Sequence, residues 1–258
     1  MTVYSPDNSP EQNLDILANN SYPGRLIVIG FAGGLTIQAY GITGRSIGSR
    51  NRVLALQDNV VSTEIADHSQ PVGDPELTIY DAMRRFGDTH VVSNGNQTDR
   101  VGQYIRSGGT FAGAMKATKR ETDKPNYTPR ITGFYQVDAN EGEPYFGLSV
   151  IRGNANGHGS IRRLYTDQSP ELHLDPEVDE NIGFGVQTYE EDRPTGVPLP
   201  SFSEAPFRIP VVDSAKGMVD MLWDNLGENR VAAVAKTIGI VDGEITIDFQ
   251  IRNEHPNA

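Results

Sequence analysis

Short apolar segments bounded by glycine, asparagine and proline recur along most of the chain. The segments 26–31 and 35–44 are separated only by Ala-Gly-Gly, and this pattern predicts a β-hairpin. A second hairpin is predicted over 230–251, with its turn at Asp242-Gly243. Further strands are predicted at 51–57, 89–95, 129–137, 144–153, 160–167 and 183–190. Strands therefore make up most of the predicted structure.

Apolar residues at helical spacing interrupt these strands. Helices are predicted at 11–19, 77–86, 98–121 and 214–226. In the second of these segments, Leu77, Tyr80 and Met83 share one helical face. The third contains Gly108-Gly109, which is expected to divide it into two helices.

The order of these elements indicates the fold class. Helices and strands do not alternate regularly, so a doubly wound parallel sheet is disfavoured. An α+β fold with mainly antiparallel sheets and helices on their outer faces is expected instead, and two stacked sheets between helix layers are one such solution. Residues 1–21 are predicted to be a polar N-terminal extension and 22–258 a single domain, with a long excursion at the proline-rich stretch 192–210.

Composition narrows the classes of function. The chain has 258 residues and a formal net charge of −12, which disfavours a general nucleic-acid binder because such proteins neutralise many phosphates. With no cysteine, disulfides and thiolate chemistry are excluded, and a cytoplasmic location is favoured. The amino terminus does not resemble a signal peptide, and no run approaches about 18 apolar residues, so no membrane span is expected.

Against this acidic background, the stretch GRSIGSRNR at 44–52 is unusual. It contains Arg45, Arg50 and Arg52 together with the hydroxyls of Ser46 and Ser49. Planar guanidinium groups bind phosphate through paired hydrogen bonds, so the stretch is chemically suited to a phosphomonoester. A solvated loop between two strands is the alternative interpretation.

Other segments carry weaker signals. GDTHVVSNGNQTD, at 87–99, joins a strand to a helix with many small polar side chains, which suits either an anion site or an ordinary turn with an N-cap. The five histidines show no metal-binding spacing, so no metal is expected. The glycine-rich segment 153–160 is expected to form a hairpin turn, and the acidic run 175–181 a solvated surface.

Four motifs in order carry a family resemblance. YPGR at 22–25, GRSIGSRNR at 44–52, IYDAMRRFGDTHVVSNGNQTD at 79–99 and NYTPRITG at 126–133 resemble the archaeal-type inosine monophosphate (IMP) cyclohydrolase family. The resemblance implies a four-layer α/β/β/α sandwich like that of N-terminal nucleophile hydrolases, and a homo-oligomer that is often a tetramer. It also implies the last step of purine biosynthesis, in which 5-formamidoimidazole-4-carboxamide ribonucleotide closes to IMP and water without metal or cofactor.

The same resemblance assigns site residues. Tyr80 matches the family's catalytic tyrosine, suited to donating a proton to the formyl oxygen, and Glu121 matches the active-site carboxylate. A core tyrosine and a surface helix end are the respective alternatives. Substrate-binding and phosphate-binding roles are expected for Arg25, Arg45, Arg50, Asn94, Gly95 and Lys236.

Two other functions remain open. An amide hydrolase on the same fold would need an exposed amino-terminal nucleophile, for which Thr2 is the formal candidate. A catalytically altered protein that binds purine nucleotides would keep the arginine pocket without turnover. The expected partner in each nucleotide-based case is a small-molecule purine nucleotide.

Overall fold

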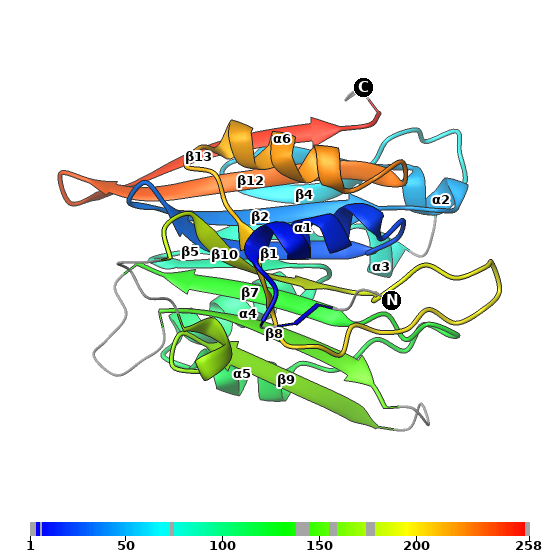
Figure 1. The fold of residues 1–258 in the computed structure, drawn as a ribbon, viewed down its shortest axis with the longest axis horizontal. Coiled ribbons are helices and arrows are strands. Elements are labelled where there is room, and N and C mark those ends of the chain that lie inside the picture. Colours follow the sequence, from blue (N-terminus) through cyan, green and yellow to red (C-terminus); the bar gives the residue numbers. More distant parts are fainter. Residues whose placement is uncertain are drawn as a thin grey trace.

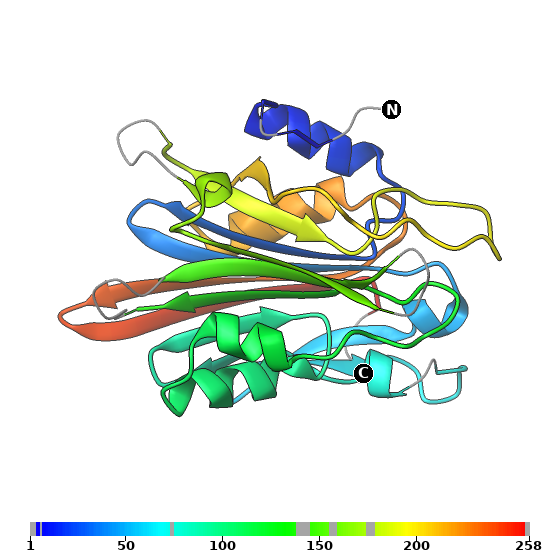
Figure 2. The same ribbon diagram turned by 90° about the horizontal axis from the view of Figure 1, so that it is seen from below.

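Two antiparallel sheets stack face to face in the computed structural model, with helices outside them (Figures 1 and 2). The structure describes residues 4–5, 7–72, 75–137, 145–154, 159–173 and 179–255. The first sheet has six strands in the order β11-β10-β1-β2-β12-β13. Their bounds are β1 Arg25–Ala32, β2 Leu35–Thr43, β10 Ile182–Gln187, β11 Phe207–Pro210, β12 Arg230–Val241 and β13 Glu244–Asn253.

The second sheet has seven strands that follow one another in chain order, from β3 to β9. Their bounds are β3 Arg52–Gln57, β4 Val60–Ile65, β5 Asp81–Phe86, β6 Thr89–Ser93, β7 Arg130–Gln136, β8 Phe146–Gly153 and β9 Ser160–Thr166. Every strand pair in both sheets is antiparallel. The expected mainly antiparallel mixture of strands and helices is therefore confirmed.

The main core lies between the two sheets. Ile27 and Ile29 of β1 reach across to β7, where a side chain at Gly133 would stand 2.8 Å from Ile29 Cδ1. Glycine at 133 therefore lets the sheets approach closely. Because alternate strand residues face the same side, Arg25 and Ile27 share the inner face of β1. The register places Tyr40 of β2 beside Ile27, and Gln38 beside Ile29.

Helices cover the outer faces. Helices α1, Pro10–Asn19, and α6, Ala215–Asn225, lie over the six-stranded sheet, while α4, Gln97–Arg106, and α5, Phe111–Ala117, lie over the seven-stranded sheet (Figure 2). A second apolar cluster fills the space beneath α4 and α5 and includes Phe86, Phe111 and Phe134. The short elements are α2 Ile47–Arg50, α3 Pro75–Thr78 and the 3-10 turn η1 Pro170–Leu172.

The N-terminal helix α1 is packed against the body of the protein. Ser9 caps it through a reciprocal pair of hydrogen bonds with Gln12. Leu17 is fully buried, and Asn13 Nδ2 donates to the carbonyl of Arg208 on β11 at 2.9 Å. The segment before residue 22 thus contributes to the outer layer rather than forming only a polar lead-in.

The helix predicted over 77–86 is wrong. Only Pro75–Thr78 is helical, and Asp81–Phe86 is strand β5, which forms a hairpin with β6. Met83 joins the core between the sheets, whereas Phe86 packs toward α4, so β5 is buried on both faces. Such a strand loses the alternating pattern and can imitate helical spacing.

The remaining predicted elements are mostly confirmed. Both hairpins form, and α4 and α5 separate around Gly108-Gly109. Strands β4 and β11 were not predicted. The sequence segments 155–158 and 174–178 lie outside the described residues, so most of the expected turn at 153–160 and the acidic run at 175–181 are not described.

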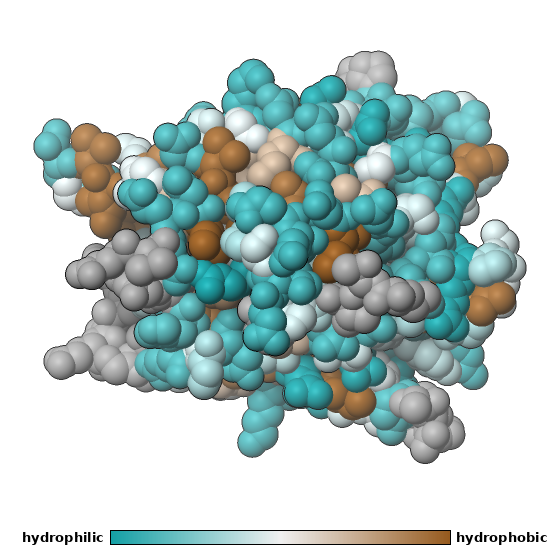
Figure 3. All heavy atoms as spheres, viewed as in Figure 1, coloured by the Kyte–Doolittle hydropathy of each residue, from teal (hydrophilic) through white to brown (hydrophobic). Residues whose placement is uncertain are grey.

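Most of the face in Figure 3 is hydrophilic, with scattered apolar residues. Within the described residues, no helix is both long and apolar enough to cross a membrane.

Candidate active site

A cavity of about 170 Å³ lies where loops from both sheets meet. Its lining includes the first residue of β1 and of β3, the α2 and α3 turns, the residue that follows β6 and the segment that precedes β7. The lining residues are Arg25, Ser46, Ser49, Arg52, Leu77, Thr78, Asn94, Glu121 and Thr128. The pocket is therefore positively charged on one side and carries a carboxylate on another.

Arg52 is one of the largest fully buried side chains, with 1% of its surface exposed. The α2 turn places it: Ser46 and Ser49 cap each other's backbone, and the Ser49 carbonyl accepts from Arg52 Nε at 3.0 Å and from Nη2 at 2.7 Å. The remaining nitrogen, Nη1, is buried and has no hydrogen-bond partner among the described residues. A buried donor without a partner is costly, and here it belongs to a side chain that lines the pocket.

Arg25 provides the second guanidinium. Its Nη1 donates to the carbonyls of Gly24 and Thr43, both at 3.2 Å, and its Nε donates to Tyr80 Oη at 3.4 Å. Among the described residues, neither Arg25 nor Arg52 forms an ion pair with a carboxylate. Arg25 and Arg52 therefore line one pocket, and neither is paired with a carboxylate among the described residues.

Two tyrosines complete this cationic side. Tyr40 Oη and Tyr80 Oη lie 2.7 Å apart, and both residues are buried. Burial and the neighbouring Tyr80 raise the pKa of Tyr40 well above its usual value. Burial also tends to raise the pKa of Tyr80, but Arg25, Arg52 and the hydrogen bond from Tyr40 outweigh it and lower that pKa. For Arg52, burial and then the charge of Arg25 lower the pKa to about 10, so it stays protonated at neutral pH.

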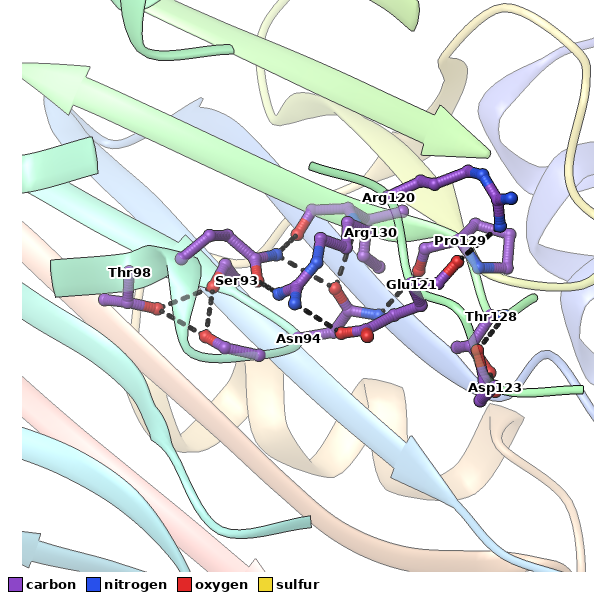
Figure 4. A network of polar contacts seen from close by, with 12 residues as sticks. Ser93, Asn94, Thr98, Arg120, Glu121, Asp123, Thr128, Pro129 and Arg130 are labelled. Atoms are coloured by element: carbon purple, nitrogen blue, oxygen red, sulfur yellow. Dashed lines mark hydrogen bonds and ion pairs between the residues drawn. The ribbon is translucent and has the colours of Figure 1, made fainter. Parts of the chain in front are cut away.

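Glu121 lies at the other side of the pocket in a polar network (Figure 4). Its Oε1 is 2.6 Å from Arg130 Nη2, and the two side chains are only 16% and 11% exposed. Burial lowers the pKa of Arg130 while the charge of Glu121 opposes that shift. Arg130 Nη1 also contacts Gln97 Oε1. The carboxylate is therefore held in one orientation.

Asn94 fixes the backbone of the neighbouring strand. Its Nδ2 donates to the carbonyl of Pro129 at 2.8 Å, and its Oδ1 accepts from the amide of Ile131 at 2.9 Å (Figure 4). These bonds tie the end of β6 to the start of β7. Asn94 thus shapes the pocket wall that it lines.

Comparison with known proteins assigns the chain to a family. A family model described as IMP cyclohydrolase-like protein matches residues 22–243. The chain belongs to the IMP cyclohydrolase-like family. It is 30% identical over 183 residues to the IMP cyclohydrolase of Methanocaldococcus jannaschii, covering 66% of this chain and 88% of that relative. It is 31% identical over 182 residues to the IMP cyclohydrolase of Haloquadratum walsbyi, covering 69% of this chain and 76% of that relative.

Several family residues predicted from the sequence meet at this pocket. Arg25, Asn94 and Glu121 line it, whereas Tyr80 is not part of the lining and its hydroxyl accepts a hydrogen bond from Arg25 Nε at 3.4 Å. Gly95 is next to the pocket, and a side chain there would stand 2.7 Å from Gln97 Oε1 and 2.8 Å from Arg130 Nη1. Glycine at 95 therefore leaves room for the network that holds Glu121.

Arg45 and Arg50 are engaged outside the pocket lining. Arg45 pairs with Asp192 at 2.5 Å and lies over the Tyr22 ring at 4.5 Å, while Arg50 Nη1 donates to the Gly44 carbonyl at 3.2 Å. The segment 47–50 is a helical turn that ends before β3. Of the three arginines in this stretch, Arg52, the first residue of β3, lines the pocket.

Lys236 lies away from the pocket, between the sheets. It is 1% exposed, and its Nζ is 3.2 Å from His90 Nδ1. Burial, assisted by the charge of Arg85, lowers the pKa of Lys236 to about 7. The pKa of His90 is lowered to about 2 by burial and then by Lys236.

Three members of the site were not assigned from the sequence: Arg52, Tyr40 and Arg130. Arg52 belongs to the arginine-rich stretch 44–52, but the spacing of its arginines does not indicate whether Arg50 or Arg52 lines the pocket. Arg130 belongs to the NYTPRITG motif, which was a usable signal. Tyr40 has no local signal, because its contact with Tyr80 joins residues 40 positions apart.

A larger hollow of about 760 Å³ lies between α1 and the segment 190–204. Carboxylates dominate its ionisable lining, namely Asp15, Glu190, Glu191, Asp192 and Glu204, with Arg193. This lining repels a phosphate, so the smaller cationic pocket is the better candidate for a nucleotide. In the described part of the chain, no three His, Asp or Glu side chains are grouped closely enough to hold a metal ion.

Proposed function

We propose that the protein is an IMP cyclohydrolase, which closes the second ring of 5-formamidoimidazole-4-carboxamide ribonucleotide to give IMP and water. Family membership and the names of the two relatives support this assignment. The observation that carries it in the structure is a pocket lined by the buried Arg52, the partly buried Arg25 and the oriented carboxylate of Glu121, in which neither Arg25 nor Arg52 is ion-paired among the described residues.

The 5′-phosphate is the strongest fixed charge on the substrate, and we assign it to Arg25 and Arg52. A buried cation without a partner is unfavourable, so a dianion that accepts from both guanidiniums relieves that cost. Arg52 offers its unpartnered Nη1, and the hydroxyls of Ser46 and Ser49 line the same side. In this assignment Arg45 and Arg50 are not direct ligands.

Ring closure is intramolecular. The carboxamide nitrogen attacks the formyl carbon, a tetrahedral carbinolamine forms, and water then leaves. Because both reacting groups belong to one molecule, the enzyme gains most by holding them in the reactive geometry, and by stabilising the developing oxyanion. Binding residues on both sides of the pocket serve the first purpose.

Proton transfer is assigned to Tyr80 and Glu121. Glu121, held by Arg130, accepts a proton from the carboxamide nitrogen as the new bond forms. Tyr80 donates its phenolic proton to the formyl oxygen as the carbinolamine forms. The carbinolamine hydroxyl then leaves as water with the proton that Glu121 took up, while the formamido nitrogen gives its proton back to the Tyr80 phenolate. The Tyr80 hydroxyl accepts a hydrogen bond from Arg25 Nε at 3.4 Å, and this position beside a residue that lines the pocket supports the role.

The cavity of about 170 Å³ is smaller than the roughly 300 to 1,000 Å³ of typical ligand sites. We therefore expect the pocket to widen when the nucleotide enters. Thr128, at its rim, is tied to Tyr189 by a hydroxyl contact of 2.9 Å, so this part of the rim moves together with the segment after β10.

Finer features of the assignment are also proposals. The outer helices and stacked sheets support the four-layer α/β/β/α sandwich of N-terminal nucleophile hydrolases. A cytoplasmic homo-oligomer is supported by the family resemblance, and sedimentation analysis would measure the subunit number. The amide-hydrolase alternative is less favoured, because the pocket residues matched here need no amino-terminal nucleophile.

The direct experiment is to incubate the purified protein with the formamido ribonucleotide and follow IMP formation by ultraviolet absorbance. Turnover is expected without added metal, and Tyr80→Phe is expected to abolish it. Tyr4→Phe is the matched control, because Tyr4 is a buried tyrosine whose hydroxyl bonds Gln187 outside the pocket. An unchanged rate in Tyr80→Phe would remove Tyr80 from the mechanism.

Binding without turnover would instead favour the catalytically altered nucleotide-binding protein. The phosphate assignment has its own test, in which IMP and inosine are compared as ligands of Arg52→Gln. Loss of affinity for IMP, with inosine binding unchanged, is expected. Equal losses for both ligands would mean that Arg52 contacts another part of the nucleotide.

A further inference from the structure

The cationic side of the pocket contains more positive charge than its surroundings neutralise. Arg25 and Arg52 have no carboxylate ion-pair partner among the described residues, and the nearby Glu121 is paired with Arg130. The hydrogen-bond partner of Arg25 Nε is the phenol of Tyr80. Within the described residues, this phenol is the acidic group that contacts Arg25 directly, and on ionisation it would supply negative charge there.

The two phenols are arranged to share one proton. The separation of 2.7 Å between Tyr40 Oη and Tyr80 Oη is that of a good O–H···O hydrogen bond, and either oxygen can be the donor. Tyr80 Oη also accepts from Arg25 Nε. If Tyr80 loses its proton, Tyr40 and Arg25 both donate to the resulting oxygen anion, which is a favourable arrangement for a buried negative charge.

We propose that the phosphate of a bound nucleotide and the ionised Tyr40–Tyr80 pair are alternative counter-ions for Arg25 and Arg52. In the pH range in which the pair is ionised in the free protein, nucleotide binding then drives it to take up one proton. The proton comes from solvent and forms the O–H bond of Tyr80, while no other covalent bond changes. The pair goes from one negative charge to none as the phosphate dianion brings two. This inference rests on the proposed nucleotide site.

The charges around Tyr80 come from several elements. Arg25 of β1 and Arg52 of β3 favour the ionised phenol, and Tyr40 of β2 donates to it. Arg130 of β7 also interacts electrostatically with Tyr80, but Glu121 already neutralises it. Together these groups lower the pKa of Tyr80, and a phosphate placed on the two arginines would raise it again.

A tyrosine that donates a proton to the substrate must be protonated when the substrate is bound. The two arginines near Tyr80 favour the ionised phenol when no nucleotide is bound. The substrate's own phosphate supplies the missing negative charge. The donor is thereby made ready in the complex, whereas in the free enzyme the phenol stabilises the two arginines.

The test is a spectroscopic titration of tyrosine ionisation, which follows the phenolate absorbance of the full-length protein with pH. The protein is titrated alone, with saturating IMP, and with saturating inosine, and the absorbance of the free ligand is subtracted. In the free protein, one of the 10 tyrosines is expected to ionise at lower pH than the others. With IMP its midpoint is expected to rise by about one pH unit or more, and with inosine it is expected to stay.

Variants identify the group. Tyr80→Phe is expected to remove the early ionisation, and Tyr40→Phe to move it upward, because the anion loses a donor. Tyr4→Phe should leave it unchanged. If either pocket variant fails to fold, the wild-type comparison of IMP with inosine still decides the question. An early ionisation that IMP does not shift, or one that persists in Tyr80→Phe, would overturn the proposal.

A second readout uses kinetics. The alkaline limb of kcat/KM reports the free enzyme and that of kcat reports the complex. We expect kcat/KM to fall at a lower pH than kcat, and coincident limbs would contradict the coupling.

Failure of the proposed function is distinguishable from failure of this inference, because IMP would then neither bind in calorimetry nor be formed. In that event, inorganic phosphate replaces IMP in the titration, and the absence of a shift with phosphate also counts against the inference.

Discussion

Gln38 and Tyr40, two residues apart on the inner face of β2, each belong to a buried polar cluster. One cluster borders the pocket, and the other is enclosed between the sheets. Tyr40 belongs to the cluster with Tyr80, Arg25 and Arg52, which borders the pocket. Gln38 belongs to a cluster with His90 and Lys236, which is enclosed between the sheets. Both clusters contain a cation that is about 99% buried and has no carboxylate partner among the described residues.

The surroundings of a buried cation indicate whether it can bind a ligand or only affects stability. Arg52 remains charged, because its pKa falls only to about 10, and its unpartnered nitrogen belongs to a side chain that lines a cavity. Lys236 has a pKa of about 7, so much of its charge is lost at neutral pH. Beside it, Gln38 Oε1 and His90 Nε2 are buried and have no hydrogen-bond partner in the part of the chain that the structure describes. The first arrangement suits a ligand anion, whereas the second mainly costs stability.

The largest expected effect is on activity at the pocket cluster. Arg52→Gln should reduce kcat/KM for the formamido ribonucleotide by about a hundred- to a thousandfold, because a desolvated charge contact to phosphate is lost. Its thermal stability should not fall, since an uncompensated buried charge is removed. A loss of both activity and folding would mean that Arg52 is mainly structural, so melting curves should accompany the kinetics.

The enclosed cluster should show the reverse behaviour. Lys236→Met should raise the free energy of unfolding at pH 7 by about 1 to 4 kcal/mol while leaving kcat/KM unchanged. The side chain is protonated up to about pH 10.4 in the unfolded chain but only to about 7 in the folded protein. The wild type should therefore gain stability as pH rises between these values, and the variant should lack this gain.

Denaturant unfolding at several pH values measures both variants. A wild-type curve that is flat between pH 7 and 9, or a clear loss of activity in Lys236→Met, would contradict the contrast between the clusters.

His90 gives a smaller effect on the acidic side. Its pKa is about 2 in the folded protein and about 6.5 when unfolded, so the unfolded chain takes up a proton first as pH falls. The free energy of unfolding should therefore decrease below pH 6.5. His90→Gln should reduce the slope between pH 6.5 and 5, a window chosen because most carboxylates titrate below it. An unchanged slope would assign the acid sensitivity to other groups.

The smallest effects are expected at the two arginines that lie outside the pocket lining. Arg45→Gln and Arg50→Gln should each change kcat/KM by less than about fivefold, because partly exposed pairs such as Arg45–Asp192 contribute about 0 to 1 kcal/mol. The same assay that measures Arg52→Gln checks them. A loss as large as that of Arg52→Gln would mean that Arg45 or Arg50 also binds the phosphate.

Much of the fold could be predicted from local patterns. The turn at Asp242-Gly243 has the positive φ angles that this sequence favours, so the β12–β13 hairpin is predictable. The missed strand β4 follows a similar turn at Asp58-Asn59, whose φ angles are also positive, and this signal was available. Strand β5 was mistaken for a helix because burial on both faces removes the period of two.

The site was predictable only in part. Arg25, Asn94 and Glu121 line the pocket, as expected from the family motifs. The choice among Arg45, Arg50 and Arg52 depended on the direction of a four-residue helical turn, which spacing does not determine. Lys236 was expected near the substrate, but β12 directs it between the sheets toward His90.

The sequence by itself determined most of the strands and helices, since local periodicity and turn chemistry act over a few residues, whereas strand β5 depended on tertiary burial of both its faces. It also determined the chemical groups available, an arginine-rich stretch in an acidic chain. Only the tertiary structure decided which cations share a hollow and which are sealed in the core. The reason is that electrostatics and desolvation depend on distances between residues far apart in the chain, such as the 2.7 Å that joins Tyr40 to Tyr80.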